Sequence, residues 1–370
     1  MALTPTELRA HLSGGALLAF PVTPFAADGG VDVPRLRAHV AWLLRHRPDG
    51  LFVCGGTGEF VSLSAAEWRL AVAAAVEEVA GAVPVLAGCG YGAAMAREMV
   101  AAAAALGCDG ALVLPPYLTL AEQEGLFAHY AAIAADARIG LVVYQRDNAV
   151  FAPPTVAALA ALPSLAGFKD GLGEPERLRR IALATEGRLP LMNGLPTAEL
   201  SQEALGAVGA TSYSSAVFNF VPELAMRFYQ AWRQGDRATV GALLASFYAP
   251  FAALRDRRRG YAVALVKAAV ALVAAPCGPV RPPLPTPAAE DVAELRVLLG
   301  RNGVPLPSLT APGSRRPWAP PGWGRHGPRR LGRSAPAVPP SAGRWPGDRL
   351  ARRRPRRRSA GSRASAARAR

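Results

Sequence analysis

The chain has 370 residues, 51% of them hydrophobic, so it can build a sizeable core, and an α/β barrel of this order of length folds as one unit. Its net charge of +15 comes from residues 314–370, which contain 17 Arg and one Asp and so carry +16, leaving −1 for residues 1–313. Because residues 1–313 are nearly neutral, net charge gives no reason to expect that they bind nucleic acid or a membrane surface.

The N-terminal residues predict a short capped helix rather than a secretion signal. In LTPTELRAHL (3–12), Thr4 is the expected N-cap, Pro5 the first helical residue and Glu7 the third. The apolar segment 14–22 that follows is too short to span a bilayer. We therefore expect no signal peptide, no membrane segment and a cytoplasmic protein.

The four cysteines, Cys54, Cys89, Cys108 and Cys277, form no CxxC pair and show no zinc-type spacing with the five histidines. This scatter in a long chain is typical of buried thiols in a reducing compartment. No metal site is expected.

Eight short apolar segments recur along the chain, each followed by an Ala- and Leu-rich helical pattern. This alternation predicts a closed (β/α)8 TIM barrel, with an open doubly wound sheet as the alternative. No glycine-rich phosphate-binding motif follows the first strand, which disfavours the open sheet. The expected strands are 16–22, 50–54, 83–87, 110–114, 139–144, 165–169, 189–193 and 209–213, and helix starts are expected at Asp32, Ser64, Thr119 and Pro175.

Three further helical patterns follow residue 234. The expected organisation is a barrel over 1–233, a helical appendage over 234–306, and a linker with an Arg/Pro-rich disordered tail over 307–370. For the tail, a phosphate-binding basic arm and sequence without function both remain open. Lys267 lies in the second helical pattern, far from any strand end, and we interpret it as a surface cation whose stem lies along apolar residues.

Lysine is scarce, because Lys169 and Lys267 are the only lysines among 42 basic residues. Lys169 stands at the end of the expected strand 165–169, and such strand ends face the active site of a barrel. Desolvation there lowers the pKa of the amine, and a neutral amine can attack a carbonyl, as a guanidinium cannot. Lys169 is therefore a candidate nucleophile, with a structural or salt-bridging lysine as the alternative. Its neighbour Asp170 is expected to pair with Arg146 or to cap a loop.

Polar groups also follow neighbouring expected strands. Tyr144 could transfer protons to and from a reacting group, or it could be a core aromatic. The segment CGGTGEF (54–60) offers backbone amides and the Thr57 hydroxyl to a carboxylate. The alternative is a plain glycine-rich turn in which Glu59 is a helix-start carboxylate.

Several segments across residues 1–300 resemble the dihydrodipicolinate synthase / N-acetylneuraminate lyase superfamily, and GGTGEF, YQRDNAVF and SSAVFNF resemble its 5-dehydro-4-deoxyglucarate dehydratase branch. The resemblance implies a TIM barrel and a class I lysine enzyme that needs no metal or organic cofactor. The matching segments are FPVTPF (20–25), GGTGEF (55–60), LPPYLTLAEQEGLFAHY (114–130), VYQRDNAVF (143–151), GFKDGLG (167–173), NGLPTAE (193–199) and YSSAVFNF (213–220).

The resemblance also implies roles for individual residues. Lys169 would form a Schiff base, Tyr144 would be the phenolic acid/base, and Thr57 with the Gly56 amide would hold the carboxylate beside the substrate ketone. Tyr117 would be the aromatic residue that relatives contribute across a subunit interface. Arg146 would bind the distal carboxylate of the substrate. The residues that would bind its polyhydroxy-acid end are Asn193, Ser214 and Ser215.

Two departures from the synthase pattern are present. Synthases have a threonine where Gly56 stands, so their hydroxyl relay to the tyrosine does not pass through this position. QRDNAV (145–150) replaces the synthase segment after Tyr144, so a synthase-type second substrate is not expected.

The implied activity is dehydration and decarboxylation of 5-dehydro-4-deoxy-D-glucarate to 2,5-dioxopentanoate. One alternative is an aldolase or lyase that releases pyruvate from a keto-deoxy sugar acid. The other is a non-catalytic barrel that binds nucleic acid or acidic partners through its tail. The expected partners are the small-molecule sugar acid and further copies of this chain.

Overall fold

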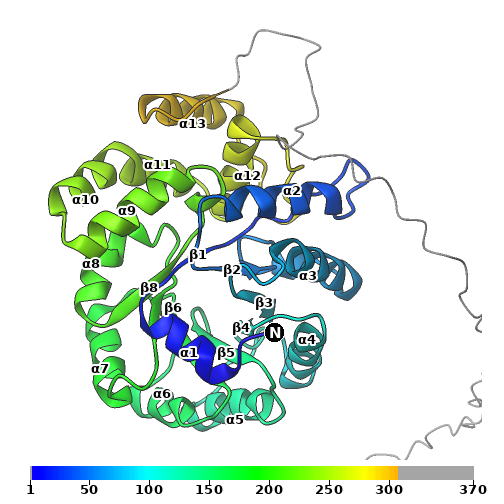
Figure 1. Ribbon diagram of the computed structural model, residues 1–370, viewed down its shortest axis with the longest axis vertical. Coiled ribbons are helices and arrows are strands. Elements are labelled where there is room, and N and C mark those ends of the chain that lie inside the picture. The colour runs from blue at the N-terminus through cyan, green and yellow to red at the C-terminus, as the bar shows by residue number, and fades with distance from the viewer. Residues whose placement is uncertain (1, 307–370) are drawn as a thin grey trace, which may run out of the picture. The chain divides into compact units, whose positions relative to one another are not determined.

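The described part of the chain, residues 2–306 of a computed structural model, contains eight parallel strands that form a closed barrel in sequence order (Figure 1). The last strand pairs with the first, with Leu17 opposite Tyr213. The (β/α)8 barrel is thereby confirmed, and the open doubly wound sheet is wrong. The strands are β1 (Leu17–Ala19), β2 (Gly50–Val53), β3 (Val85–Cys89), β4 (Gly110–Val113), β5 (Gly140–Gln145), β6 (Leu165–Asp170), β7 (Leu191–Asn193) and β8 (Ala210–Ser215).

A helix follows each strand, and Figure 1 shows these helices arranged around the barrel. Ser64 and Glu67 form a capping box at one helix start, and the Asp32 carboxylate accepts from the Arg35 amide at another. The helices are α2 (Val33–Leu44), α3 (Ala65–Val79), α4 (Ala93–Ala105), α5 (Gln123–Ala134), α6 (Pro153–Ala160), α7 (Pro175–Thr185), α8 (Glu199–Ala207) and α9 (Pro222–Gln234).

The expected helix starts at Asp32, Ser64 and Pro175 are confirmed, but the one at Thr119 is wrong. Helix α5 begins later, at Gln123. The reason is local, because the Thr119 hydroxyl donates to the Tyr117 carbonyl within the preceding loop and caps no helix.

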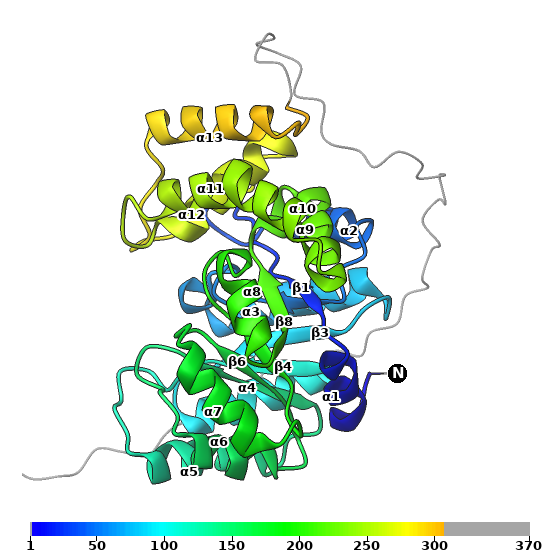
Figure 2. The same ribbon diagram turned by 90° about the vertical axis from the view of Figure 1, so that its left-hand side faces the viewer.

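Helix α1 (Pro5–Ser13) lies against the amino-terminal end of the barrel (Figure 2). Thr4 and Glu7 form the predicted capping box at its start. On its buried face, Leu8 packs so closely on the first residues of β4 and β5 that a Cβ at Gly110 or Gly140 would lie 2.7 Å from its methyl group. Helix α1 therefore covers this end of the barrel, and a site must open at the carboxyl ends of the strands.

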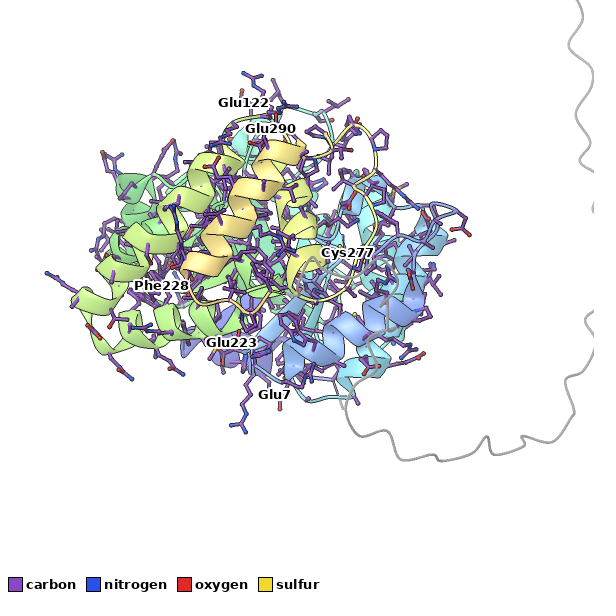
Figure 3. All side chains as sticks on the ribbon, turned by 90° about the horizontal axis from the view of Figure 1, so that it is seen from above. Glu7, Glu122, Glu223, Phe228, Cys277 and Glu290 are labelled. Carbon is purple, nitrogen blue, oxygen red and sulfur yellow. The ribbon has the colours of Figure 1, made fainter. Side chains whose placement is uncertain are left out.

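The C-terminal helices pack on the barrel as a further layer, and Figure 3 shows α13 lying over α11 and α12. Between α10 and α11 the helix makes one π-helical turn directly before Pro250, whose ring and missing N–H disfavour a regular α-helical turn. The helices are α10 (Arg237–Leu243), α11 (Ala249–Arg255), α12 (Tyr261–Val273) and α13 (Ala289–Arg301). The expected division at residue 233 stays a prediction, and the expected linker and tail, 307–370, lie outside the described residues.

The continuous helix Arg237–Arg255 is long and apolar enough, by length and composition, to cross a membrane. However, Phe247, Tyr248 and Phe251 on this helix are buried against the rest of the described chain. The same length and composition are found in core helices, and these buried aromatics indicate such a helix here.

We predict that Leu8→Ala destabilises the barrel by about 2–5 kcal/mol, because a fully buried leucine is replaced by a cavity at the covered end. Urea unfolding monitored by circular dichroism measures the change. The control is Leu70→Ala, which truncates a half-exposed leucine of α3 and should change the free energy of unfolding by about 0.5 kcal/mol or less. Equal losses in the two variants would contradict the role of α1.

Candidate active site

Lys169 and Tyr144 are direct neighbours at the carboxyl ends of β6 and β5, where the parallel register places them opposite each other. Both side chains are buried. The Lys169 Nζ lies 3.8 Å from the centre of the Tyr144 ring and 5.0 Å from that of Phe20. Two aromatic faces therefore surround the amine.

The carbonyl of Gly194, just after β7, fixes the polar ends of this pair. It accepts a hydrogen bond from the Tyr144 hydroxyl at 2.7 Å and lies 3.5 Å from the Lys169 Nζ. A Cβ at Gly194 would lie 2.7 Å from Lys169 Cγ and 2.9 Å from Nζ. Only glycine leaves room for the amine here. Gly194 was not among the predicted site residues, although a glycine directly after a strand end could have indicated a close approach.

The environment shifts the pKa of both groups in useful directions. Burial lowers the pKa of Lys169 well below its usual value, and the nearby Arg146 lowers it further, against the opposing effect of Asp170. The amine is therefore more readily neutral and nucleophilic. Burial raises the pKa of Tyr144, so its phenol stays protonated and can donate a proton.

Asp170 caps the loop after β6, which is one of its two expected roles. Its carboxylate accepts from the Gly173 amide at 2.9 Å and from the Gln145 side chain at 2.7 Å. The alternative, a pair with Arg146, is wrong, since the carboxylate bonded to Arg146 is that of the adjacent Asp147, at 2.8 Å. Asp170 thereby ties the ends of β5 and β6 together.

The segment 54–60 forms a tight loop after β2. A Cβ at Gly55 would lie 2.7 Å from the Phe20 ring, whereas one at Gly56 would meet nothing within 4 Å. The Thr23 hydroxyl donates to the Gly58 carbonyl at 2.7 Å and anchors the far side of the loop. Gly56 and Thr57 line the cavity described below, so the loop presents unobstructed backbone and a hydroxyl to it.

Lys267 is not a surface cation, and that interpretation is wrong. Its side chain is 3% exposed, and Nζ bonds the fully buried Glu59 carboxylate at 2.7 Å. Glu59 is likewise not a helix-start carboxylate, because it accepts from the Arg281 amide at 2.9 Å and makes no capping bond. Helix α12 turns Lys267 inward, and the partner is 208 residues away in sequence.

A cavity of about 590 Å³ opens at the carboxyl ends of the strands. It brings together seven of the nine predicted site residues. The Tyr117 side chain is exposed at its rim, 63% of its surface being accessible. The seven are Gly56, Thr57, Tyr117, Tyr144, Arg146, Lys169 and Ser214.

Asn193 and Ser215 do not line this cavity, so we do not retain their expected role in substrate binding. The Asn193 amide donates to the Ala198 carbonyl at 2.9 Å and to two side chains of α8. The Ser215 hydroxyl donates to the buried Glu199 carboxylate at 2.6 Å. Both side chains are fully buried and point away from the barrel interior because their strand neighbours, Met192 and Ser214, face inward.

Arg255 is a cavity residue that the sequence analysis missed. It comes from the end of α11, and its guanidinium donates to the Thr197 hydroxyl at 2.6 Å and to the Pro196 carbonyl at 2.8 Å. The cavity therefore has two guanidinium groups, that of Arg146 directly after β5 and that of Arg255 at the end of α11. No strand-end pattern could have indicated a residue that a C-terminal helix contributes.

Residues 2–306 contain no group of three His, Cys, Asp or Glu side chains that could hold a metal. The four cysteines are buried free thiols, as the sequence predicted. Burial raises their pKa, to about 11 for Cys277 and about 12 for Cys108, so they are not reactive thiolates.

Known proteins resemble this chain over most of its described residues. The model of the dihydrodipicolinate synthetase family matches residues 13–301. A protein of Bradyrhizobium diazoefficiens, named probable 5-dehydro-4-deoxyglucarate dehydratase, is 49% identical over 298 residues, covering 80% of this chain and 95% of the relative. One of the same name from Streptomyces griseus is 48% identical, covering 85% and 99%.

A solved structure shows the same architecture. YagE, a prophage protein of the dihydrodipicolinic acid synthase family from Escherichia coli K12, was crystallised in complex with pyruvate. It superimposes with a TM-score of 0.71 at 25% identity, covering 78% of this chain and 99% of YagE.

We predict that Arg146→Met raises the pKa of Lys169, since it removes a cation that disfavours the ammonium. An uncharged acylating reagent reacts only with the neutral form of the amine. The pH dependence of acylation at Lys169, followed by mass spectrometry, therefore measures this pKa. Arg258→Met removes an arginine that lies over Tyr261 and should leave the value unchanged. An unchanged or lower pKa in Arg146→Met would contradict the electrostatic argument.

Proposed function

This chain belongs to the dihydrodipicolinate synthetase family, and from that premise we propose that it dehydrates and decarboxylates 5-dehydro-4-deoxy-D-glucarate to 2,5-dioxopentanoate, CO2 and water. The observation that carries the proposal is the Lys169 amine, which is buried against Tyr144 at the floor of a cavity lined by two arginines. The names of the curated relatives support the choice of substrate.

The first step uses the lowered pKa of Lys169. The neutral amine attacks the keto carbon, and loss of water gives an iminium that acidifies the adjacent methylene. Removal of a proton from this methylene and departure of the β-hydroxyl as water give a conjugated iminium. Tyr144, whose raised pKa keeps the phenol protonated, gives its proton to the leaving hydroxyl, and the resulting phenolate takes up the methylene proton, so that the phenol is restored.

Decarboxylation follows from the same covalent bond. The conjugated iminium accepts the electron pair released when the carboxylate beyond the eliminated hydroxyl leaves as CO2. Protonation and hydrolysis then release 2,5-dioxopentanoate and free Lys169. The iminium is the electron sink, so the residues present supply the chemistry without a further cofactor.

We assign different parts of the cavity lining to the two carboxylates of the proposed substrate. We assign the carboxylate beside the ketone to the Gly56 amide and the Thr57 hydroxyl, and their position in the cavity lining supports this. Arg146 and Arg255 are the cations available for the distal carboxylate. Arg146 is the better donor, because it bonds Asp147 through Nε, whereas the bonds of Arg255 to Thr197, Pro196 and Asp256 use Nε and both Nη atoms. Ser214 also lines the cavity, which supports it as a ligand for a substrate hydroxyl.

We also propose that the chain works in the cytoplasm as a homo-oligomer. Three large apolar side chains near the cavity rim are exposed, and contact with a second copy would cover them. They are Tyr117, Leu118 and Leu120. This interface would place Tyr117 beside the partner's cavity as well as its own.

Lys169→Arg should abolish turnover and the adduct that borohydride traps with pyruvate, because a guanidinium keeps the charge but forms no Schiff base. Mass spectrometry locates the adduct in the unaltered protein. Product analysis then separates the two lyase alternatives: equal amounts of CO2 and 2,5-dioxopentanoate support the dehydratase, and release of pyruvate supports an aldolase. Full turnover by Lys169→Arg would exclude the Schiff base.

Tyr144→Phe should lower kcat by about 10²- to 10⁴-fold while leaving pyruvate trapping at Lys169 intact. The reason is that phenylalanine keeps the ring that covers the amine and removes only the hydroxyl bonded to Gly194. Parallel assays of turnover and of borohydride trapping measure the split. Equal loss of both would show that Tyr144 acts by supporting the amine rather than by proton transfer.

A further inference from the structure

The second lysine of the chain lies beneath the loop that is placed for the substrate carboxylate. Lys267 Nζ bonds Glu59 Oε1 at 2.7 Å and the Pro279 carbonyl at 3.0 Å, and it lies 4.1 Å from the centre of the Phe25 ring. The other Glu59 oxygen accepts from the Arg281 amide at 2.9 Å. We call Glu59, Lys267 and the Arg281 amide the Glu59 clamp.

The backbone of the loop explains why it needs a clamp. Cys54 at its start and Glu59 near its end have φ values of 52° and 56°, in the left-handed region that non-glycine side chains disfavour. The Glu59 amide donates to the Gly56 carbonyl at 3.1 Å, so the position of Glu59 is transmitted directly to Gly56. Such strain persists only where the surroundings fix the residue.

The clamp also connects this loop to the C-terminal helices. Lys267 comes from α12, and the same helix contributes Val263 and Val266 to the cavity wall. Thr57, two residues before Glu59, lines the cavity on the other side of the loop. A shift of the Glu59 carboxylate would therefore move the Gly56 amide and the Thr57 hydroxyl, whereas Lys169 lies on β6 against Tyr144 and the Gly194 carbonyl.

We propose that Lys267 is a positioning residue. Through Glu59, it holds the Gly56 amide and the Thr57 hydroxyl where they can bind the substrate carboxylate next to the ketone. The inference rests on the proposed function. A buried ion pair that only supported the fold could be replaced by neutral side chains with little consequence, and often with a gain in stability. The positioning role instead predicts a loss confined to substrates that carry this carboxylate.

The test compares two ketones that differ in the carboxylate. Pyruvate carries it, and hydroxyacetone is a neutral ketone that can form the same Schiff base. The double variant Glu59→Gln/Lys267→Met removes both charges at nearly constant volume, so no buried charge is left unpaired. Borohydride trapping at Lys169, quantified by mass spectrometry against ketone concentration, gives the half-saturating concentration of each ketone.

In the double variant we expect the half-saturating concentration of pyruvate to rise about 10- to 100-fold and that of hydroxyacetone to stay within about twofold, as a misplaced binding group requires. The matched control is Arg257→Met, which breaks another ion pair of the C-terminal helices, with Asp291, away from the loop. It should leave both ketones unchanged. If the double variant does not fold, Glu59→Gln alone must show the same pyruvate-specific loss.

Each other outcome has a defined meaning. Unchanged trapping of both ketones, or equal weakening of both, would overturn the positioning role, because a general structural defect does not distinguish a carboxylate. Absence of any adduct at Lys169 in the unaltered protein would instead overturn the proposed function. If Arg257→Met also raised the half-saturating concentration of pyruvate alone, the effect would belong to the C-terminal helices as a whole, and the specific role of Lys267 would be overturned.

Discussion

The exclusion of water from one amine is the constraint on which the rest of the site depends. Lys169 lies between two aromatic rings at the end of β6, with the far end of the barrel covered by α1. In water, an ammonium would be the stable form at neutral pH, and it would not attack a ketone. The barrel changes this balance by burial, and Arg146 adds to it, while Asp170 opposes it.

Much of the framework could be predicted because its signals are local in sequence. Apolar segments gave the eight strands, and a rare lysine at a strand end gave the nucleophile candidate. The errors at Asn193 and Ser215 also have a local cause. Successive side chains of a strand face opposite ways, so Met192 and Ser214 inside the barrel place Asn193 and Ser215 outside. Applied to β8, this alternation would have assigned Ser214 to the cavity and Ser215 to the outside of the barrel.

Other features depend on distances that sequence patterns do not contain. The bond between Glu59 and Lys267 joins residues 208 apart, and Arg255 reaches the cavity from α11. A lysine in a helical pattern can face solvent or the core, and only the packing of α12 on the barrel decides which. Gly194 shows the same limit, since its need for glycine arises from the position of the Lys169 side chain on another strand.

The burial of both lysines has a consequence for the outside of the molecule. The chain has two lysines in all, and each is 3% exposed, so its surface offers no lysine amine. Cross-linkers that join amines would report almost nothing about its neighbours except through the terminal amine, and modifications that occur on surface lysines have no target on the folded protein. Its contacts are better mapped through carboxylates and arginines, and an amine label on Lys267 would report that the Glu59 clamp has opened.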